Sequence, residues 1–504
     1  MVINQKKAGV VLSYAGEAVK ILSGLLYTPI LIQLLGQREY GLYQLAFSVM
    51  SYLGLLSFGF GSSYVRFHAR YLVKNDRQGI ARLNGMFMIV FCSLAVVCLL
   101  CGGVLISNIE LVFGTGLTPQ ELSKAKILLI IMVVSVAISM PNSVYNCYIT
   151  AHERFIFQKI LRLAQNILNP MLALPLMLMG FDSVAVIMVM AVLTFAVFFS
   201  NLFYCKKALS VEFSYRGLKF SLLKEMWVFT FFIFLNQLID QINWNIDKVL
   251  LGRYSGTIAV AIYGVGAHIN TIYVQTSTAI SNVFVPSINR CVAKNEDKGL
   301  TNLMTKVGRI QWFILGLIFT GFAFYGKPFI RYWAGEGYEE SYIVALILIA
   351  SITIPMIQSI GVEVQRAKNK HYISSLVYFF ITALNIILSI WLIKQYGCTG
   401  AAVGTAVSLV LGNVIFMNFY YHKYVGLNMF SFWFGIIKTL PAFITPCAFA
   451  YFYTAFVDIN SLLSLVIAML CYVVVYVVSV WFLGFNKEEK RTFSGIIHKF
   501  TKKH

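Results

Sequence analysis

Long apolar runs, separated by short polar segments, recur along the whole chain. A helix that crosses a bilayer needs about 20 mostly apolar residues, because each residue rises about 1.5 Å through a hydrocarbon core about 30 Å thick. The apolar runs predict fourteen transmembrane helices, at residues 8–35, 41–65, 83–106, 125–149, 157–179, 183–204, 226–251, 257–286, 310–326, 342–364, 373–393, 399–421, 432–456 and 462–484. The pattern therefore predicts an all-α, polytopic integral membrane protein.

The composition excludes a soluble protein. Hydrophobic residues make up 59% of the 504 residues and charged residues only 12%, whereas a soluble domain has about 25% charged residues. The apolar run at 8–35 is too long for the core of a signal peptide, so we expect it to remain as the first transmembrane helix.

The basic residues predict how the chain is oriented. Of the 40 Lys and Arg residues, 30 fall in alternate loops on one side of the predicted membrane, 7 on the other side and 3 within spans. Loops rich in Lys and Arg usually face the cytoplasm, so both termini are predicted to be cytoplasmic. The net charge of +20 then needs no nucleic-acid partner, because anionic lipid headgroups provide the opposite charge.

An internal repeat divides the chain. Residues 70–79 (RYLVKNDRQG) resemble residues 290–299 (RCVAKNEDKG), and weaker matches recur at an offset of 216. Six predicted helices separate the copies, so both have the same orientation in the membrane, as in transporters built from parallel repeats. We expect an N-terminal lobe at 1–210, a C-terminal lobe at 211–425, and two additional helices with a basic cytoplasmic tail at 426–504.

Ionisable residues inside predicted spans are candidate functional residues, because a charge at membrane depth is costly. Lys20 lies near the middle of the first span, and Glu17 shares its face three residues away. The alternative is that the two side chains neutralise each other and only stabilise the fold.

The spans at 226–251 and 257–286 carry polar stripes with helical spacing. In the first, Asp240 lies near mid-membrane, whereas Asp247 and Lys248 are close enough to the outer end to be interfacial. The first stripe consists of Asn236, Asp240, Asn243 and Asp247, and the second of His268, Thr271, Gln275, Thr278 and Asn282. Such stripes either line a water-filled lumen or hold helices together.

Catalytic and cofactor motifs are absent from the sequence. It contains no Walker A loop, no nucleophile elbow and no set of side chains with metal-ligand spacing. Cys98 and Cys101 lie in an apolar helix without a partner pair, which favours inert thiols. We therefore expect no enzymatic activity, no cofactor and no metal.

Several motifs near the N-terminus resemble those of a known family: Lys7–Tyr14 (KAGVVLSY), Leu25–Pro29 (LLYTP), Leu34–Tyr43 (LLGQREYGLY), and Phe58–Gly61 (FGFG) followed by Arg66. They resemble the bacterial oligosaccharide-lipid flippases of the polysaccharide transporter family, within the superfamily of multidrug, oligosaccharidyl-lipid and polysaccharide exporters. The motifs are concentrated in the first 85 residues, and the plan of fourteen spans extends the resemblance over the whole chain.

The resemblance implies a flippase that carries undecaprenyl-pyrophosphate-linked oligosaccharides from the inner to the outer leaflet of the bacterial cytoplasmic membrane. Such proteins serve O-antigen and other lipopolysaccharide, capsule or exopolysaccharide assembly, alongside a polysaccharide polymerase and a chain-length regulator. The family's cationic lumen implies substrate-binding roles for Lys20, Arg66 and His268. Unlike family members, this chain has no Lys or Arg near the middle of its second and eighth spans.

Two further sets of residues complete the expected site. Asn243, Lys248 and Gln275 are additional candidates for substrate binding. Coupling to H⁺ or Na⁺ needs a titratable group, for which Asp240 is the first candidate and Glu17 and Asp247 follow. Two alternative functions stay open, namely a multidrug–cation antiporter and a non-transporting scaffold of the polysaccharide assembly machinery.

Overall fold

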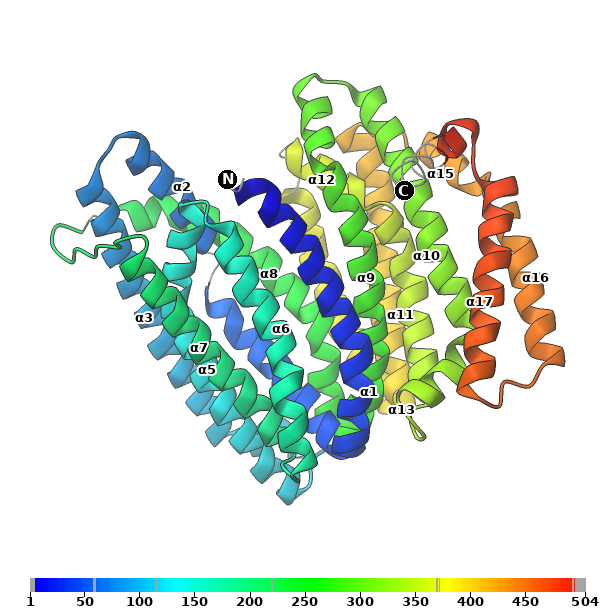
Figure 1. The fold of residues 1–504 in the computed structure, drawn as a ribbon, viewed down its shortest axis with the longest axis horizontal. Coiled ribbons are helices and arrows are strands. Elements are labelled where there is room, and N and C mark those ends of the chain that lie inside the picture. The colour runs from blue at the N-terminus through cyan, green and yellow to red at the C-terminus, as the bar shows by residue number, and fades with distance from the viewer. Residues whose placement is uncertain are drawn as a thin grey trace, which may run out of the picture. The chain divides into compact units, whose positions relative to one another are not determined.

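The computed structural model of the chain describes residues 5–57, 60–114, 116–218, 221–368, 370, 372–491 and 494. Every regular element in these ranges is a helix (Figure 1). The chain forms two compact units: residues 1–264 with 393–398, and residues 265–392 with 399–504.

The first unit contains long helices joined by short turns. Its elements are α1 (Gln5–Gly54), the 3₁₀-helix η1 (Leu55–Ser57), α2 (Phe60–Val73), α3 (Arg77–Ser107), α4 (Ile109–Phe113), α5 (Pro119–Ala151), α6 (Phe155–Leu178), α7 (Ser183–Lys207), α8 (Ser221–Tyr254) and the first turns of α9 (Gly256–Ala293). Helix α5 packs against both α3 and α7, and α1 packs against α6.

The second unit contains the rest of α9 and the later helices, together with three π-helical segments. These elements are α10 (Asp297–Trp333), α11 (Glu340–Ile357), α12 (Ser359–Ala367), most of α13 (Tyr372–Leu409), η2 (Val410–Phe416), α14 (Met417–Tyr420), η3 (Tyr421–Val425), α15 (Met429–Ile437), α16 (Pro441–Phe456), α17 (Leu462–Ser479) and η4 (Val480–Gly484). The two units do not coincide with the two predicted lobes, because α8 belongs to the first unit and to the predicted C-terminal lobe. The boundary between the lobes stays a prediction.

The helices confirm a polytopic membrane protein. Within the described ranges, nine helices are long and apolar enough to cross a membrane, or ten if α15 and α16, bent by 42°, form one span. Two of the nine are interrupted by non-helical glycines, Gly36 (φ 72°) and Gly397 (φ 54°), each between two predicted spans. Helices α6 and α8 are not among the nine, and the total of fourteen stays a prediction.

The two copies of the repeat motif form the same turn. Asn75 and Asn295 both adopt left-handed backbone conformations, with φ of 50° and 54°, which asparagine tolerates better than most residues. In each copy the residue that follows donates its N–H to the carbonyl five positions earlier, Asp76 to Tyr71 and Glu296 to Cys291. Equivalent sequences therefore start α3 and α10 with equivalent turns.

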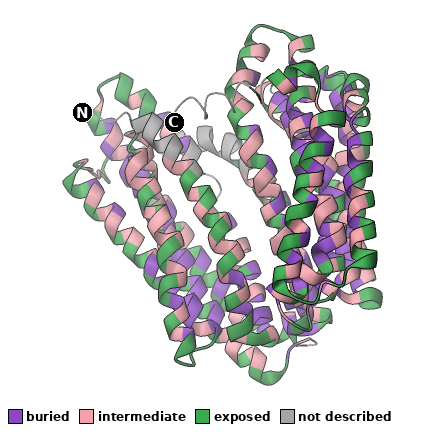
Figure 2. Ribbon diagram, turned by 45° about the vertical axis from the view of Figure 1, so that its right-hand side comes forward, coloured by how far each residue is buried: buried purple, intermediate pink, exposed green. Residues whose placement is uncertain are grey.

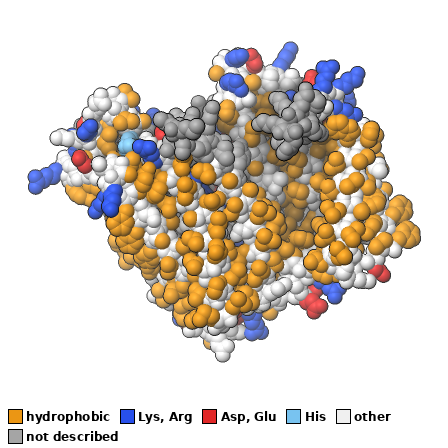
Figure 3. All heavy atoms as spheres, in the orientation of Figure 1, with side chains coloured by type: hydrophobic (Ala, Val, Ile, Leu, Met, Phe, Trp, Pro, Cys, Tyr) orange, Lys and Arg blue, Asp and Glu red, His pale blue; other side chains and the backbone are white. Residues whose placement is uncertain are grey.

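Apolar side chains occupy both the interior and the outer faces of each unit. In the first unit, Tyr64, Phe87 and Phe91 belong to a buried cluster between α2, α3 and α5. Figure 2 shows exposed residues along the helices, and Figure 3 shows hydrophobic side chains over much of the visible surface. Leu100 on α3 and Phe482 in η4 are among the exposed apolar side chains. Apolar patches of this extent are unfavourable in water and suit a lipid environment.

Candidate functional site

Lys20 lines a cavity of about 280 Å³ between α1, α6 and α7 in the first unit, which we call the α1–α6–α7 pocket. Its walls consist of Lys20, Ser23 and Tyr27 from α1, Gln165, Asn166, Asn169 and Pro170 from α6, and Met190, Leu193 and Thr194 from α7. Residues three or four apart on a helix share a face, so each helix presents one stripe to the pocket. Ammonium, hydroxyl and carboxamide groups thus meet inside a predicted transmembrane bundle.

Two polar atoms of this pocket have no hydrogen-bond partner. Tyr27 Oη and Asn169 Oδ1 are buried and unpartnered, whereas Thr194 Oγ1 donates to the backbone carbonyl of Met190 at 2.8 Å. Buried polar groups are nearly always paired in folded proteins. The two unpartnered atoms therefore have hydrogen-bonding capacity left for a ligand.

Lys20 and Glu17 are both exposed. No ion pair joins them in the described part of the chain, although their spacing of three residues allows one. The ammonium group of Lys20 is therefore available to a ligand at the mouth of the pocket.

The charged residues of α8 differ in their surroundings. Asp247 is 1% exposed and accepts a hydrogen bond from Tyr263 Oη at 2.6 Å. Lys248 donates to Gln44 Oε1 on α1 at 3.1 Å. Asp240 is exposed and Asn243 is half-buried. Asp247 and Lys248 therefore bind α8 to its neighbours, whereas the side chain of Asp240 is an exposed carboxylate on this helix.

The remaining predicted site residues do not line the α1–α6–α7 pocket. Arg66 is exposed on α2. In the second unit, His268 is half-buried and its ring stacks on Trp333 with centroids 6.0 Å apart, and Gln275 is half-buried on the same helix. The side chain of Asn236, which the sequence places on the α8 stripe, lies outside the described residues.

A network at the predicted outer end of the first unit was not anticipated from the sequence. Glu39 accepts hydrogen bonds from Lys124 Nζ and Ser183 Oγ, both at 2.6 Å, and Lys124 also pairs with Asp182. The short sequence Thr118-Pro-Gln-Glu121 forms a capping box, a signal that sequence reasoning can find.

Close backbone contacts lie at the same end. A Cβ at Gly116 would overlap the carbonyl oxygen of Gly252, and a Cβ at Gly41 would overlap that of Thr257. We call this contact between the helix ends of the first unit the glycine seam. It requires glycine because no other residue permits so close an approach.

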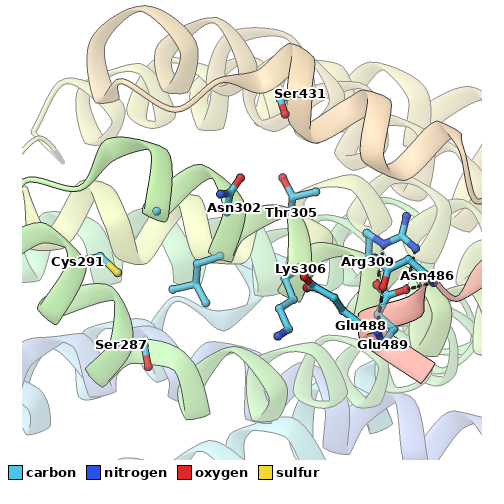
Figure 4. Close-up of a pocket in the computed structure, with 12 residues that line it drawn as sticks. Ser287, Cys291, Asn302, Thr305, Lys306, Arg309, Ser431, Asn486, Glu488 and Glu489 are labelled. Atoms are coloured by element: carbon cyan, nitrogen blue, oxygen red, sulfur yellow. Dashed lines mark hydrogen bonds and ion pairs between the residues drawn. The ribbon is translucent and has the colours of Figure 1, made fainter. Parts of the chain in front are cut away.

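A second cavity, of about 490 Å³, lies between α9, α10, α15 and the segment after η4 (Figure 4). At one end Arg309 donates to both carboxylate oxygens of Glu489, at 2.7 and 2.8 Å, and to the carbonyls of Gly435 and Gly484. Both side chains are buried. We call this arrangement the Arg309–Glu489 clasp, and it fixes the C-terminal helices to α10.

The fold is similar to that of solved membrane transporters. A solved structure named "Lipid II flippase MurJ, inward closed conformation" aligns with a TM-score of 0.72 and 14% identity, over 94% of this chain and 97% of that one. The family described as "Polysaccharide biosynthesis protein" matches residues 7–292. Because this match covers more than half of the chain, the chain belongs to that family.

Curated relatives extend the match. A Bacillus subtilis protein named "Uncharacterized membrane protein EpsK" is 22% identical, with 92% of each chain covered. A Shigella flexneri protein named "Putative O-antigen transporter" is 20% identical over 79% of this chain and 93% of its own. A Haloferax volcanii protein named "Probable flippase AglR" is 24% identical over 34% of this chain and 37% of its own. These findings confirm the predicted membrane fold and the resemblance to polysaccharide flippases.

Proposed function

We propose that the chain carries undecaprenyl-pyrophosphate-linked oligosaccharide repeat units from the inner to the outer leaflet of the bacterial cytoplasmic membrane. The observation that supports this most directly is Lys20, an available cation beside a pocket of carboxamides and hydroxyls, in a member of a polysaccharide biosynthesis family. The delivered units feed cell-surface polysaccharide assembly, so a polymerase and a chain-length regulator are the proposed partners.

The physical chemistry of the substrate supports this role. A pyrophosphate and a sugar chain cannot cross about 30 Å of hydrocarbon unaided, because their hydration would be lost without replacement. A lumen with Lys20, Arg66 and His268 replaces water around the phosphates, and Asn243, Lys248 and Gln275 add hydrogen-bonding groups. Two lobes that open alternately to the two sides move the substrate, with both chain termini in the cytoplasm.

An ion gradient supplies the driving force in this proposal. The proposed carriers of H⁺ or Na⁺ are Asp240, followed by Glu17 and Asp247. Asp240 comes first because its carboxylate is exposed, whereas Asp247 is buried against Tyr263.

Deletion of the gene, followed by extraction of lipid-linked intermediates, tests the function. We expect the intermediate to accumulate and surface polysaccharide to disappear. Lys20→Ala should fail to restore the polysaccharide although the protein inserts, and Lys20→Arg should restore much of it because the charge is kept. Lys207→Ala, at the exposed end of α7, is the matched control.

Other outcomes would contradict the proposal. Drug sensitivity without loss of polysaccharide would indicate a multidrug antiporter. Loss of polysaccharide without any flipping by the purified protein in liposomes would indicate a scaffold. Full export by a stably inserted Lys20→Ala variant would remove the role of Lys20.

A further inference from the structure

The α1–α6–α7 pocket contains hydrogen-bond acceptors that an ionised phosphate cannot use. Lys20 provides the only charged group among its lining residues, and three carboxamides and the Tyr27 hydroxyl provide neutral ones. A phosphate needs donors, because its ionised oxygens only accept hydrogen bonds. Lys20 satisfies that need, but the unpartnered oxygen of Asn169 does not.

The unpartnered atoms indicate which part of a ligand, other than a phosphate, the pocket binds. Asn169 Oδ1 is an acceptor and requires a donor from the ligand. Turned by 180°, the amide presents its NH2 group at the same place and requires an acceptor instead, so a ligand group that both donates and accepts satisfies Asn169 in either orientation. Tyr27 Oη both donates and accepts. A sugar hydroxyl also does both and therefore matches each of these groups.

The charge and the size of the pocket restrict the kind of ligand further. A metal cation is disfavoured, because the described lining includes an ammonium group and no carboxylate. The volume of about 280 Å³ lies near the lower end of the range of about 300–1,000 Å³ for small-molecule pockets. The pocket therefore has room for one sugar residue and not for a whole oligosaccharide.

We propose that the α1–α6–α7 pocket binds the sugar that adjoins the pyrophosphate of the carried lipid. Lys20 contacts the phosphate at the mouth of the pocket, while Asn169 and Tyr27 hydrogen-bond to hydroxyls of that first sugar. This inference rests on the proposed function and adds a specificity-determining subsite to it.

The experiment compares two probes on the purified full-length protein in lipid nanodiscs. One probe is undecaprenyl pyrophosphate, and the other is the lipid-linked oligosaccharide extracted from the deletion strain. We expect wild type to bind the sugar-bearing lipid more tightly. Asn169→Leu and Tyr27→Phe should each weaken that binding about tenfold, as expected for one hydrogen bond lost in a buried site, and leave undecaprenyl pyrophosphate binding unchanged.

The controls separate this inference from the proposed function. Ser200 lies on α7 outside the pocket, and its hydroxyl donates to the carbonyl four residues earlier, as that of Thr194 does. Ser200→Ala should therefore change the affinity for neither probe. Lys20→Ala should weaken binding of both probes. Replacing an unpartnered amide by leucine of similar shape does not harm folding, and retained binding of undecaprenyl pyrophosphate verifies the fold.

The binding measurements decide whether the pocket is a subsite for the sugar. Unchanged binding of the sugar-bearing lipid by both Asn169→Leu and Tyr27→Phe overturns it, as does equal weakening of both probes. If Lys20→Ala still weakens both probes, the proposed function survives that result. If wild type binds neither probe, the proposed function itself fails.

Discussion

Asp240 is an exposed carboxylate on α8, and its charge is the feature that the coupling proposal uses. Asp240→Asn keeps the shape and hydrogen-bonding capacity of the side chain but removes the titratable group. In proteoliposomes with an imposed pH or sodium gradient, we expect this variant to lose gradient-driven accumulation while substrate still equilibrates across the bilayer. Undiminished accumulation would show that coupling lies elsewhere, and Asp458→Asn, an exposed carboxylate beyond α16, is the control.

His68 gives the first unit a pH-dependent stability. Its ring lies beyond the predicted span 41–65, is 1% exposed and contacts Tyr148 and His152, and neither ring nitrogen has a hydrogen-bond partner. Burial lowers the pKa of His68 from 6.5 to about 4, and the nearby His152 adds to this effect. The unfolded chain therefore takes up a proton below pH 6.5 that the folded chain does not.

Stability should consequently fall as the pH drops from 6.5 towards 4. Thermal unfolding of the detergent-solubilised protein measures this as a decreasing Tm. His68→Phe, which keeps an aromatic ring, should flatten the dependence over that interval, whereas His422→Gln, at an exposed position, should not. An unchanged slope in His68→Phe would assign the pH dependence to other groups.

At the scale of the elements, the Arg309–Glu489 clasp joins α10 to the C-terminal helices. Breaking a buried pair leaves one charge uncompensated and costs about 3–5 kcal/mol, so Glu489→Gln should lower the Tm clearly. Glu363→Gln, which removes the more exposed pair with Arg366, should cost about 0–1 kcal/mol.

A double variant distinguishes the pair from its surroundings. Arg309→Met with Glu489→Leu removes both charges and should regain much of the stability lost in Glu489→Gln. A Tm for Glu489→Gln equal to that of wild type would mean that the clasp contributes nothing to stability.

The glycine seam makes a second prediction at this scale. Gly116→Ala places a methyl group against the carbonyl of Gly252, and overpacking of this kind costs about 1–3 kcal/mol. We expect a lower Tm in the same unfolding assay. Gly103→Ala is the matched control on α3, because a Cβ there meets nothing within 4 Å. Equal effects of the two substitutions would show that the seam yields without cost.

Sequence patterns predicted elements better than the contacts between them. The breaks at Gly36 and Gly397 fall between spans that the apolar runs separate, and the repeated turn at Asn75 and Asn295 lies within the motif that the sequence repeats. Lys20 was also predicted as a candidate site residue from its position in an apolar run.

Contacts between helices could not be derived in this way. Arg309 and Glu489 are 180 residues apart, and hydrophobic periodicity does not specify which helix faces meet. The partners of Lys20 in its pocket were missed for the same reason, because Asn169 and Thr194 on α6 and α7 carry no signal that links them to α1.

For the whole molecule, the uneven distribution of Lys and Arg predicts which loops face outward. In a background without the nine native cysteines, single cysteines at the exposed positions Gln120 and Gly337 should react with an impermeant reagent added to intact cells. Cysteines at Arg77 and Lys298, also exposed, should react only after permeabilisation. Labelling at position 77 in intact cells would reverse the predicted orientation.

The glycine seam and the neighbouring network of Glu39, Lys124 and Asp182 stabilise the same end of the first unit through different interactions. The network consists of charges that are partly exposed, so dissolved salt screens it over a Debye length of about 8 Å at physiological ionic strength. The seam is a fit between uncharged backbones, which ions do not weaken. The shape of the backbones therefore sets the contact at this end, and a change in the ionic strength of the surrounding solution alters only the part that depends on charge.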